Sequence, residues 1–263
     1  MNDTRTLLTE RTVHEEAVII AKKYLGKHNG FHIVEFEPRD LDITYYDKPK
    51  RNAPFPTYFN AGFFAYFAEQ VNGIKVNFTL PVANLMADID IGIPSLGRKY
   101  IEEWTGRKVT DKVILNCSQN PSADFKQKDI ATLMADRYNH AVIKDVNVID
   151  SGVRIAVSGV PTIKDGKDVD WHRYVSKQWS SGVMYATYRN FLAVKGQKIY
   201  LISGRTSGAN YIYGMYFWNR MKDMKFEDCI GLDGGGSYIF KYNGVLISCT
   251  AGNRSVNNIG VIR

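Results

Sequence analysis

The alternation of apolar and polar positions along the chain predicts many strands and a few helices. At residues 10–26, apolar side chains recur every three or four positions, which is the period of a helix, and Gly26 ends the pattern. Residues 127–144 and 211–224 show a helical pattern too. We therefore expect three helices, separated by long stretches of strand.

The remaining apolar segments have the short period of strands. "FHIVEFEP" (31–38) alternates, and "LDITYYDKP" (41–49) is a second strand closed by proline. Residues 188–205 predict a hairpin, and Asn243-Gly244 is a strong signal for another hairpin turn. The predicted fold class is α+β, with a large mixed sheet and a few packed helices.

No repeat, low-complexity tract or linker divides the chain, so one main domain is expected. We place it at residues 51–263, with residues 1–50 as an N-terminal helix and strands packed on it. A chain of 263 residues can bury a sizeable core in such an arrangement. Its 44% apolar and 23% charged residues are typical of a globular protein.

Charge and cysteine content restrict the function classes only weakly. The formal net charge of +7 favours anionic partners, but the basic residues are scattered, and we interpret the one dense cluster, "KPKR" (48–51), as a solvated surface. Cys117, Cys229 and Cys249 fit neither a disulfide scaffold nor a CxxC metal site, so free thiols are expected.

The ends of the chain and its apolar runs guide the expected location. The N-terminus has acids where a signal peptide would have a basic start, and no apolar run approaches the roughly 18 residues that cross a membrane. We expect a leaderless, cytoplasmic protein with no membrane partner and no long nucleic-acid partner. If a phage encodes it, the compartment is the host cytoplasm.

The segment "IGLDGGGSYIF" (230–240) is the strongest candidate for chemistry. Three consecutive glycines between two apolar runs indicate positive φ or close approach of a ligand to the backbone. Asp233 stands at the end of the first run, where it can act as an acid, a base or a ligand-orienting group. A plain Asp-Gly hairpin turn is the alternative.

Arginines and one asparagine form a second group of candidates. Arg189, Arg205 and Arg254 each stand beside turn-forming residues at expected strand ends, where guanidinium groups suit phosphate or carboxylate. They share a site only if their strands are neighbours. Asn60 in "FNAGFF" marks a tight bend between aromatic runs, for which a bulge or turn is the simpler interpretation.

No residue spacing indicates a metal or cofactor. His172 lacks a second histidine at ligand spacing, and Asp88 with Asp90 lacks a third acid. The expected site therefore contains neither a metal nor a cofactor.

Six segments resemble motifs of the phosphodiester glycosidase family, which includes uncovering-enzyme-like proteins, and they occur along the chain in the same order as in the family. "CIGLDGGGSYIFKYNG" is similar to its N-L-D-G-G-G-S-S turn, with Gly231 for Asn and Tyr238 for the second Ser. "LISGRTSG" is similar to its D-G-R segment, with Ser203 for Asp. The other four are "FNAGFF", "VSGVPTIKDG", "TYRNFLAV" and "NRSVNNIGVIR". Residues 65–155 do not align.

The resemblance implies an α+β fold and hydrolysis of a glycosidic bond next to a phosphate. It implies Asp233 as the catalytic residue, which protonates the leaving group or activates water, and the substrate- or phosphate-binding residues would be Asn60, Arg189, Arg205, Gly234, Gly235 and Arg254. Glycosidases often use a second carboxylate, and Glu69, Asp88, Asp90 and Asp170 stay open as that partner.

The expected partner is a small phosphate-bearing sugar or nucleotide. An intracellular nucleotide is the first choice, with a cyclic dinucleotide signal cleaved at ribose C1′ by a phage-type enzyme as its most specific form. Two alternatives remain: a non-catalytic binder of a phosphorylated ligand, and a virion- or wall-associated enzyme acting on glycan phosphodiesters such as teichoic acid. The oligomeric state stays open.

Overall fold

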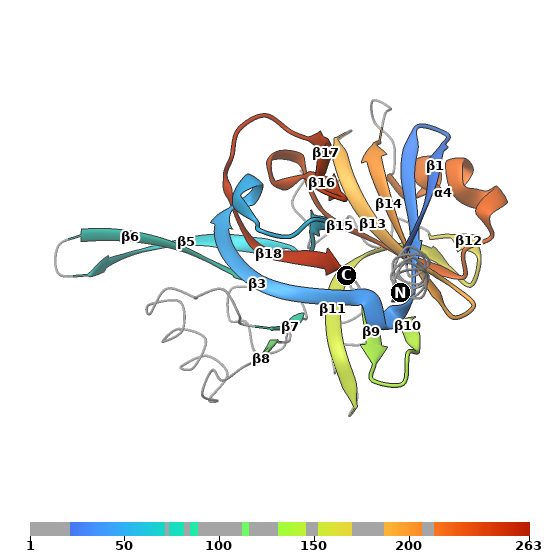
Figure 1. The fold of residues 1–263 in the computed structure, drawn as a ribbon, viewed down its shortest axis with the longest axis horizontal. Helices are drawn as coiled ribbons and strands as arrows, with labels where there is room; N and C mark the ends of the chain where they lie inside the picture. The colour runs from blue at the N-terminus through green and yellow to red at the C-terminus, as the bar shows by residue number, and fades with distance from the viewer. Residues whose placement is uncertain are drawn as a thin grey trace, which may run out of the picture.

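The computed structural model describes most of the chain in eight ranges: residues 22–71, 74–81, 85–88, 112–115, 131–145, 152–169, 187–206 and 213–263. Within these ranges the protein is almost entirely β-structure (Figure 1). The strands are β1 (Lys22–His28), β2 (Phe31–Phe36), β3 (Leu41–Pro49), β4 (Tyr58–Asn60), β5 (Phe64–Val71), β6 (Ile74–Pro81), β7 (Leu85–Asp88), β8 (Lys112–Leu115), β9 (Ala131–Asp136), β10 (Ala141–Lys144), β11 (Val153–Lys164), β12 (Lys167–Asp168), β13 (Tyr188–Lys195), β14 (Lys198–Arg205), β15 (Asp228–Gly234), β16 (Ile239–Tyr242), β17 (Val245–Cys249) and β18 (Ser255–Ile262).

Helical structure in the described ranges is sparse. The α-helix is α4 (Tyr213–Met221), and four 3-10 turns accompany it: η1 (Pro38–Asp40), η2 (Lys50–Asn52), η6 (Lys222–Met224) and η7 (Gly235–Ser237).

Sixteen of the described strands join in one sheet. Its main path runs β1-β2-β14-β13-β15-β11-β7-β3-β18-β4-β16-β17, and β8, β9, β10 and β12 attach beside β7 and β11. Neighbouring strands are antiparallel except β3 and β7, which are parallel. The β5–β6 hairpin is a separate two-stranded sheet that extends to the left in Figure 1.

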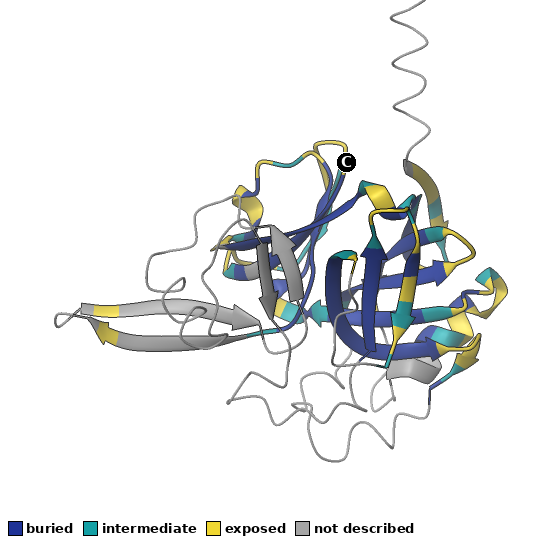
Figure 2. Ribbon diagram, turned by 90° about the horizontal axis from the view of Figure 1, so that it is seen from below, coloured by how far each residue is buried: buried dark blue, intermediate teal, exposed yellow. Residues whose placement is uncertain are grey.

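The long sheet folds so that its two ends face each other across the main core. The first half contains β2, β14, β13 and β15, and the second contains β3, β18, β4 and β16. One buried cluster draws side chains from both halves, including Val34, Leu192 and Leu201 from the first, and Phe59 and Phe240 from the second. Figure 2 shows buried positions running along the strands and exposed ones gathering at turns.

Two further clusters cover the outer faces of the halves. Helix α4 covers the first half, where the rings of Phe191 and Phe217 stack with centroids 3.9 Å apart. The outer face of the second half carries Tyr46, Tyr58 and Ile259. Burial on both faces explains why many strands have continuous apolar runs.

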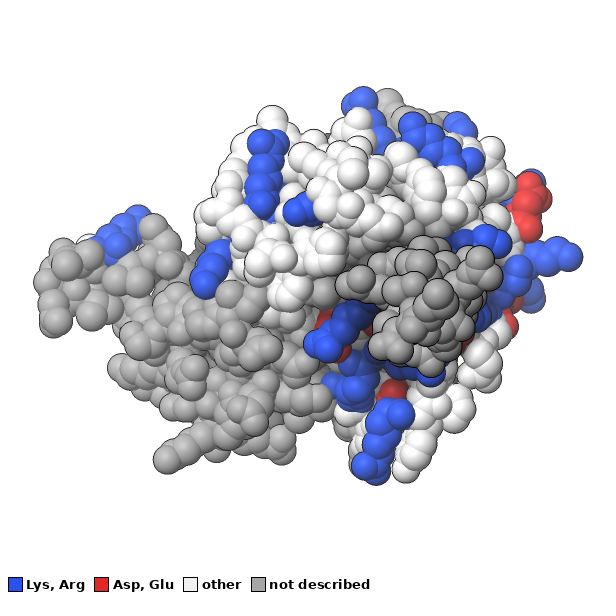
Figure 3. Space-filling view, in the orientation of Figure 1, with Lys and Arg blue, Asp and Glu red and all other residues white. Residues whose placement is uncertain are grey.

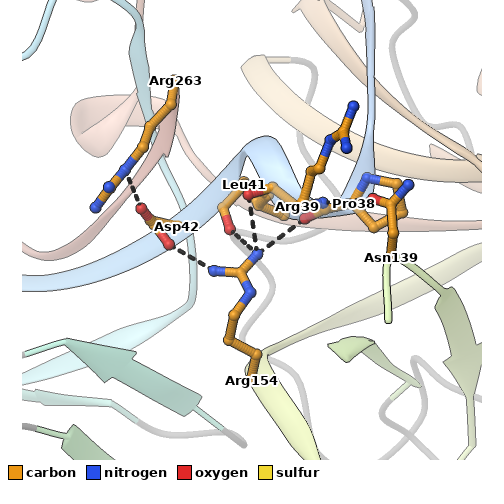
Figure 4. A network of polar contacts seen from close by, with 7 residues as sticks. All are labelled: Pro38, Arg39, Leu41, Asp42, Asn139, Arg154 and Arg263. Carbon is orange, nitrogen blue, oxygen red and sulfur yellow. Dashed lines mark hydrogen bonds and ion pairs between the residues drawn. The ribbon is translucent and has the colours of Figure 1, made fainter. Parts of the chain in front are cut away.

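An arginine clamps the start of β3 to β11 (Figure 4). Arg154 donates to Asp42 Oδ1 at 2.6 Å, to the Leu41 carbonyl at 2.7 Å and to the Pro38 carbonyl at 2.9 Å. Arg263, the last residue, pairs with the other oxygen of Asp42. Charge-assisted bonds of this kind are strong, so the network fixes the C-terminal strand and β3 together.

The expected α+β class with several packed helices is wrong, because the described chain is mostly antiparallel β-structure with one short α-helix. The helix expected at 127–144 is replaced by β9 and β10. Residues 131–135 are all buried, and a strand buried on both faces produces the same apolar run as a helix.

The helix expected at 10–26 falls largely outside the described residues, but the prediction is wrong for its last residues, from 22 onward. Residues 22–28 form β1, whose register shifts between Tyr24 and Gly26, where Gly26 has φ of 89°. The apolar spacing there reflects a bulged strand.

Other local predictions are confirmed. Helix α4 lies within 211–224, β3 has the expected bounds, and β13 and β14 form the expected hairpin. Strand β2 begins as expected but ends at Phe36, two residues before the end of the expected strand. Asn243 and Gly244 both have positive φ in the turn between β16 and β17. The division of the chain at residue 50 stays a prediction.

Candidate functional site

The glycine turn follows directly from β15, between two strands of the main sheet. Asp233 is the penultimate residue of β15 and is partly exposed, and η7 begins at Gly235. A Cβ atom on Gly234 would lie 2.6 Å from both Arg189 Cγ and the Tyr188 carbonyl oxygen. Gly235 has φ of 58°, so both positions require glycine.

The carboxyl group of Asp233 lies in a confined and positively charged environment. Burial raises its pKa, against the opposing effects of the Ser237 hydroxyl, Arg189, Arg254 and the backbone amide of Gly234. That amide donates to Asp233 Oδ1 at 2.9 Å. The Ser237 hydroxyl is itself buried and lowers the pKa of the Asp233 carboxyl, although the two groups do not form a hydrogen bond. Burial, which favours the protonated form, is therefore the dominant effect.

The sheet register brings two of the predicted arginines to neighbouring strands. In β13, Arg189 is 2% exposed and lies opposite Gly234 of β15. Arg205 ends β14 opposite Tyr188, and its guanidinium carbon lies 5.9 Å from the centroid of the Tyr188 ring. Arg189 therefore belongs to the surroundings of Asp233, whereas exposed Arg205 lies one strand further out.

The third arginine approaches from the loop before β18. The guanidinium Nη1 of Arg254 would be 2.9 Å from a Cβ atom on Gly236, and its guanidinium carbon lies 5.4 Å from the centroid of the Phe64 ring. Gly236 therefore leaves the space that Arg254 occupies. Asp233, Arg189, Arg254 and the glycine turn form the candidate site.

Asn60 supports this site through its side-chain amide, which bonds to the backbone of Asp233 and Ile239. It is 1% exposed, and its Nδ2 donates to the Asp233 carbonyl oxygen at 2.6 Å. Its Oδ1 accepts from Asn190 Nδ2 at 2.7 Å and from the Ile239 amide at 3.2 Å. The amide of Asn60 therefore fixes the ends of β15 and β16, and its polar atoms are used within the protein.

Two departures from the family motifs contact each other. The Ser203 hydroxyl lies 2.8 Å from Tyr238 Oη and donates to Asn190 Oδ1 at 2.7 Å. Tyr238 also stacks on Tyr188, with ring centroids 5.2 Å apart. A continuous chain of polar contacts therefore leads from the interior to Asn60.

Lys50 is the residue of this region that the sequence did not reveal. We interpreted the "KPKR" cluster as solvated, but Lys50 is 0% exposed, so that interpretation is wrong for this residue. It turns inward because β3 ends there and η2 packs against the loop carrying Arg254. No residue spacing marks a buried lysine.

The other candidates lie in strands β5 and β7 or outside the described residues. Asp88 lies opposite Lys112 in the β7–β8 pair, whereas Asp90, Asp170 and His172 fall outside the described residues, as does the side chain of Glu69. In the described part of the chain, no group of three or more His, Cys, Asp or Glu residues could hold a metal ion. Cys229 and Cys249 are free thiols as expected, and Cys117 lies outside the described ranges.

Two further observations concern the charge of the surface and the length of the helices. On the face shown in Figure 3, Lys and Arg side chains lie in several separate groups. None of the described helices is long and apolar enough to cross a membrane.

Comparison with known proteins gives a fold relationship. No family model matches the chain, and no curated protein sequence does. The catalytic domain of zebrafish N-acetylglucosamine-1-phosphodiester alpha-N-acetylglucosaminidase, in a form auto-inhibited by its pro-peptide, is similar in structure, with a TM-score of 0.56 at 15% identity over 89% of this chain and 76% of that one. The two proteins therefore share a fold, at a distance.

Two more solved structures match with lower scores. A hypothetical protein from Synechocystis has a TM-score of 0.42 at 14% identity over 92% of this chain and 61% of its own. A putative exported protein from Burkholderia pseudomallei has a TM-score of 0.39 at 11% identity, over 88% of this chain and 73% of its own.

Proposed function

We propose that this protein is a hydrolase that cleaves a glycosidic bond in a phosphate-bearing sugar, with Asp233 as the catalytic acid. The observation that carries the proposal is the convergence of Asp233, Arg189 and Arg254 at a turn whose glycines leave room for both arginine side chains. The fold shared with a domain named as a phosphodiester glycosidase supports the same reaction class.

The surroundings of Asp233 suit a general acid. Its pKa is raised by burial, and a carboxyl group that stays protonated closer to neutral pH can donate a proton to a leaving oxygen. In the other half of the cycle, the same group in its ionised form can accept a proton from water.

Arg189 and Arg254 suit a phosphate that leaves or stays bound. Guanidinium groups bind phosphate oxygens in pairs and stabilise charge that develops during bond cleavage. Arg189 is fixed by its burial in β13, whereas Arg254 is exposed and packs against Phe64. One arginine of the site is therefore buried and the other is exposed.

Besides burial, the largest influences on the pKa of the Asp233 carboxyl come from a hydroxyl, two arginines and a backbone amide. A phosphate leaving group needs little protonation, because it is already a stable anion. For a sugar-1-phosphate bond, a single acid with two arginines is therefore a sufficient set of groups. In a nucleotide cleaved at ribose C1′ the base leaves, so Asp233 would protonate the base while the arginines hold the phosphate.

The substrate class is tested by mass spectrometry of products from a panel of sugar-1-phosphodiesters, teichoic acid fragments, and linear and cyclic nucleotides. Within this panel we propose a nucleotide as substrate. The wild type should release a free sugar or base, and Asp233→Asn should lose about 100-fold or more of the rate. Asp228→Asn is the matched control, because Asp228 is also a partly buried acid of β15 but stands at the strand's other end.

The outcomes separate the candidate functions. Release of a sugar from teichoic fragments alone would favour a wall-directed enzyme over one acting on nucleotides. Ligand depleted from solution but recovered intact after denaturation would show a binder and refute catalysis. An active Asp233→Asn variant would remove this carboxyl group from the chemistry.

A further inference from the structure

Lys50 is a buried lysine placed beneath the candidate site. Its ammonium nitrogen donates to the Gly236 carbonyl oxygen at 2.7 Å and to Thr250 Oγ1 at 3.0 Å, with the Thr250 carbonyl oxygen at 3.4 Å. All three acceptors are neutral oxygens. The lysine therefore contacts the glycine turn directly, at the same glycine that Arg254 approaches.

The same residue also holds the loop that carries Arg254. The backbone amide of Lys50 donates to the Arg254 carbonyl oxygen at 3.1 Å. Thr250, its side-chain partner, begins that loop and donates its hydroxyl to the Gly235 carbonyl oxygen at 2.7 Å. Through its backbone and its side chain, Lys50 thus connects the two loops that form the site.

This arrangement is costly for stability. Burial lowers the pKa of Lys50, and the neighbouring Cys249 thiol acts in the opposite direction. Among the described residues, the oxygens that accept from its ammonium group belong to a carbonyl or a hydroxyl and not to a carboxylate. A buried ammonium without a counter-ion costs free energy, and an apolar side chain of similar length would pack there at lower cost.

We propose that Lys50 is a positioning residue that sets the separation between Arg254 and the glycine turn, and thereby shapes the anion site. The anion-binding part of this inference rests on the proposed function, whereas the connection between the loops does not. By holding the Gly235 and Gly236 carbonyl oxygens on the inner side, Lys50 and Thr250 keep the turn in the one conformation that Arg254 fits.

The first experiment compares Lys50→Met with Lys48→Met by hydrogen exchange of the intact protein. Lys48 is the matched control because it has the same charge, lies two residues away and is exposed. Lys50→Met should speed exchange in residues 235–237 and 250–254 by about tenfold or more, which is the effect of losing bonds to a charged donor. Lys48→Met should change it by less than about twofold.

A double-mutant cycle then measures the connection to Arg254, with inorganic phosphate as the probe in calorimetric titration. Lys50→Met and Arg254→Met should each weaken phosphate binding about tenfold, and the double variant should be no weaker than Arg254→Met alone. A merely structural role would give additive losses.

If Lys50→Met fails to fold, Thr250→Val replaces it, because it removes the hydroxyl between Lys50 and Gly235 and keeps the side-chain shape.

The outcomes distinguish this inference from the proposed function. Equal exchange in Lys50→Met and Lys48→Met would overturn the connection between the loops, as would additive losses in the phosphate cycle. A wild-type protein that neither binds phosphate nor cleaves any panel member would overturn the proposed function, and faster exchange in Lys50→Met would still support the connection.

Discussion

Replacing Asn60 by aspartate tests how the interior supports the site, because the change is nearly isosteric. Asn60 Nδ2 donates to the Asp233 carbonyl oxygen at 2.6 Å, and an ionised carboxylate would instead place two acceptors against each other. The donors from Asn190 and Ile239 remain and partly stabilise the new charge. The side chain is 1% exposed, so water cannot compensate.

The expected loss follows from these contacts. An uncompensated buried charge costs about 3–5 kcal/mol, and the two remaining donors place Asn60→Asp near the lower end, about 3 kcal/mol at neutral pH. A protonated carboxyl can donate to the Asp233 carbonyl oxygen again, so in acid the loss should fall to about 1 kcal/mol. A domain is commonly stable by about 5–15 kcal/mol, so the variant should still fold.

Urea unfolding at about pH 7.5 and pH 5 measures both values. Asn253→Asp is the control, because Asn253 is exposed, and it should change stability by less than about 0.5 kcal/mol. A loss below about 1 kcal/mol at neutral pH, or the same loss at both pH values, would refute the role given to the Asn60 amide.

Three further perturbations follow from the described contacts. Gly234→Ala forces a Cβ within 2.6 Å of the backbone of β13, so it should lower the free energy of unfolding in urea by about 3 kcal/mol. Gly62→Ala is the control: its Cβ would meet its nearest atom at 3.4 Å, so the loss should be clearly smaller. The pKa of Asp233 is raised in the folded state, so its stabilising contribution is complete below the unfolded pKa and is lost as pH rises through the folded pKa. Asp233→Asn should therefore gain thermal stability relative to the wild type as the pH rises from about 4 to about 8. A difference in thermal stability that stays constant with pH would contradict the raised pKa. Arg154→Met removes the clamp on β3 and should cost about 2–3 kcal/mol by the same unfolding assay; no measurable loss would show that the clamp contributes little.

The turn-forming residues of the sequence predict much of the β-structure. Proline at the end of β3, the Asn243-Gly244 turn and the hairpin at 188–205 have the expected positions, because each depends on a residue with a special backbone requirement. The helix expected at 127–144 failed because burial on both faces of β9 removes the alternation that would identify a strand.

The candidate site was predictable in part for a similar reason. The glycines at 234–236 and Asp233 stand next to each other in sequence, and their backbone geometry follows from local chemistry. The meeting of Arg189 with Gly234 depends on which strands pair, and the sequence leaves that open. Lys50 depends on a contact across 186 positions, with Gly236, and no local pattern contains that information.

The most direct test of the proposed reaction is hydrolysis of a sugar-1-phosphodiester in ¹⁸O-labelled water, with product masses read by spectrometry. A glycosidase acting through Asp233 should place the label on the anomeric carbon of the released sugar and none on the phosphate. Label found on the phosphate would show cleavage of the phosphorus–oxygen bond, and the assignment of this site to glycosidic chemistry would be wrong.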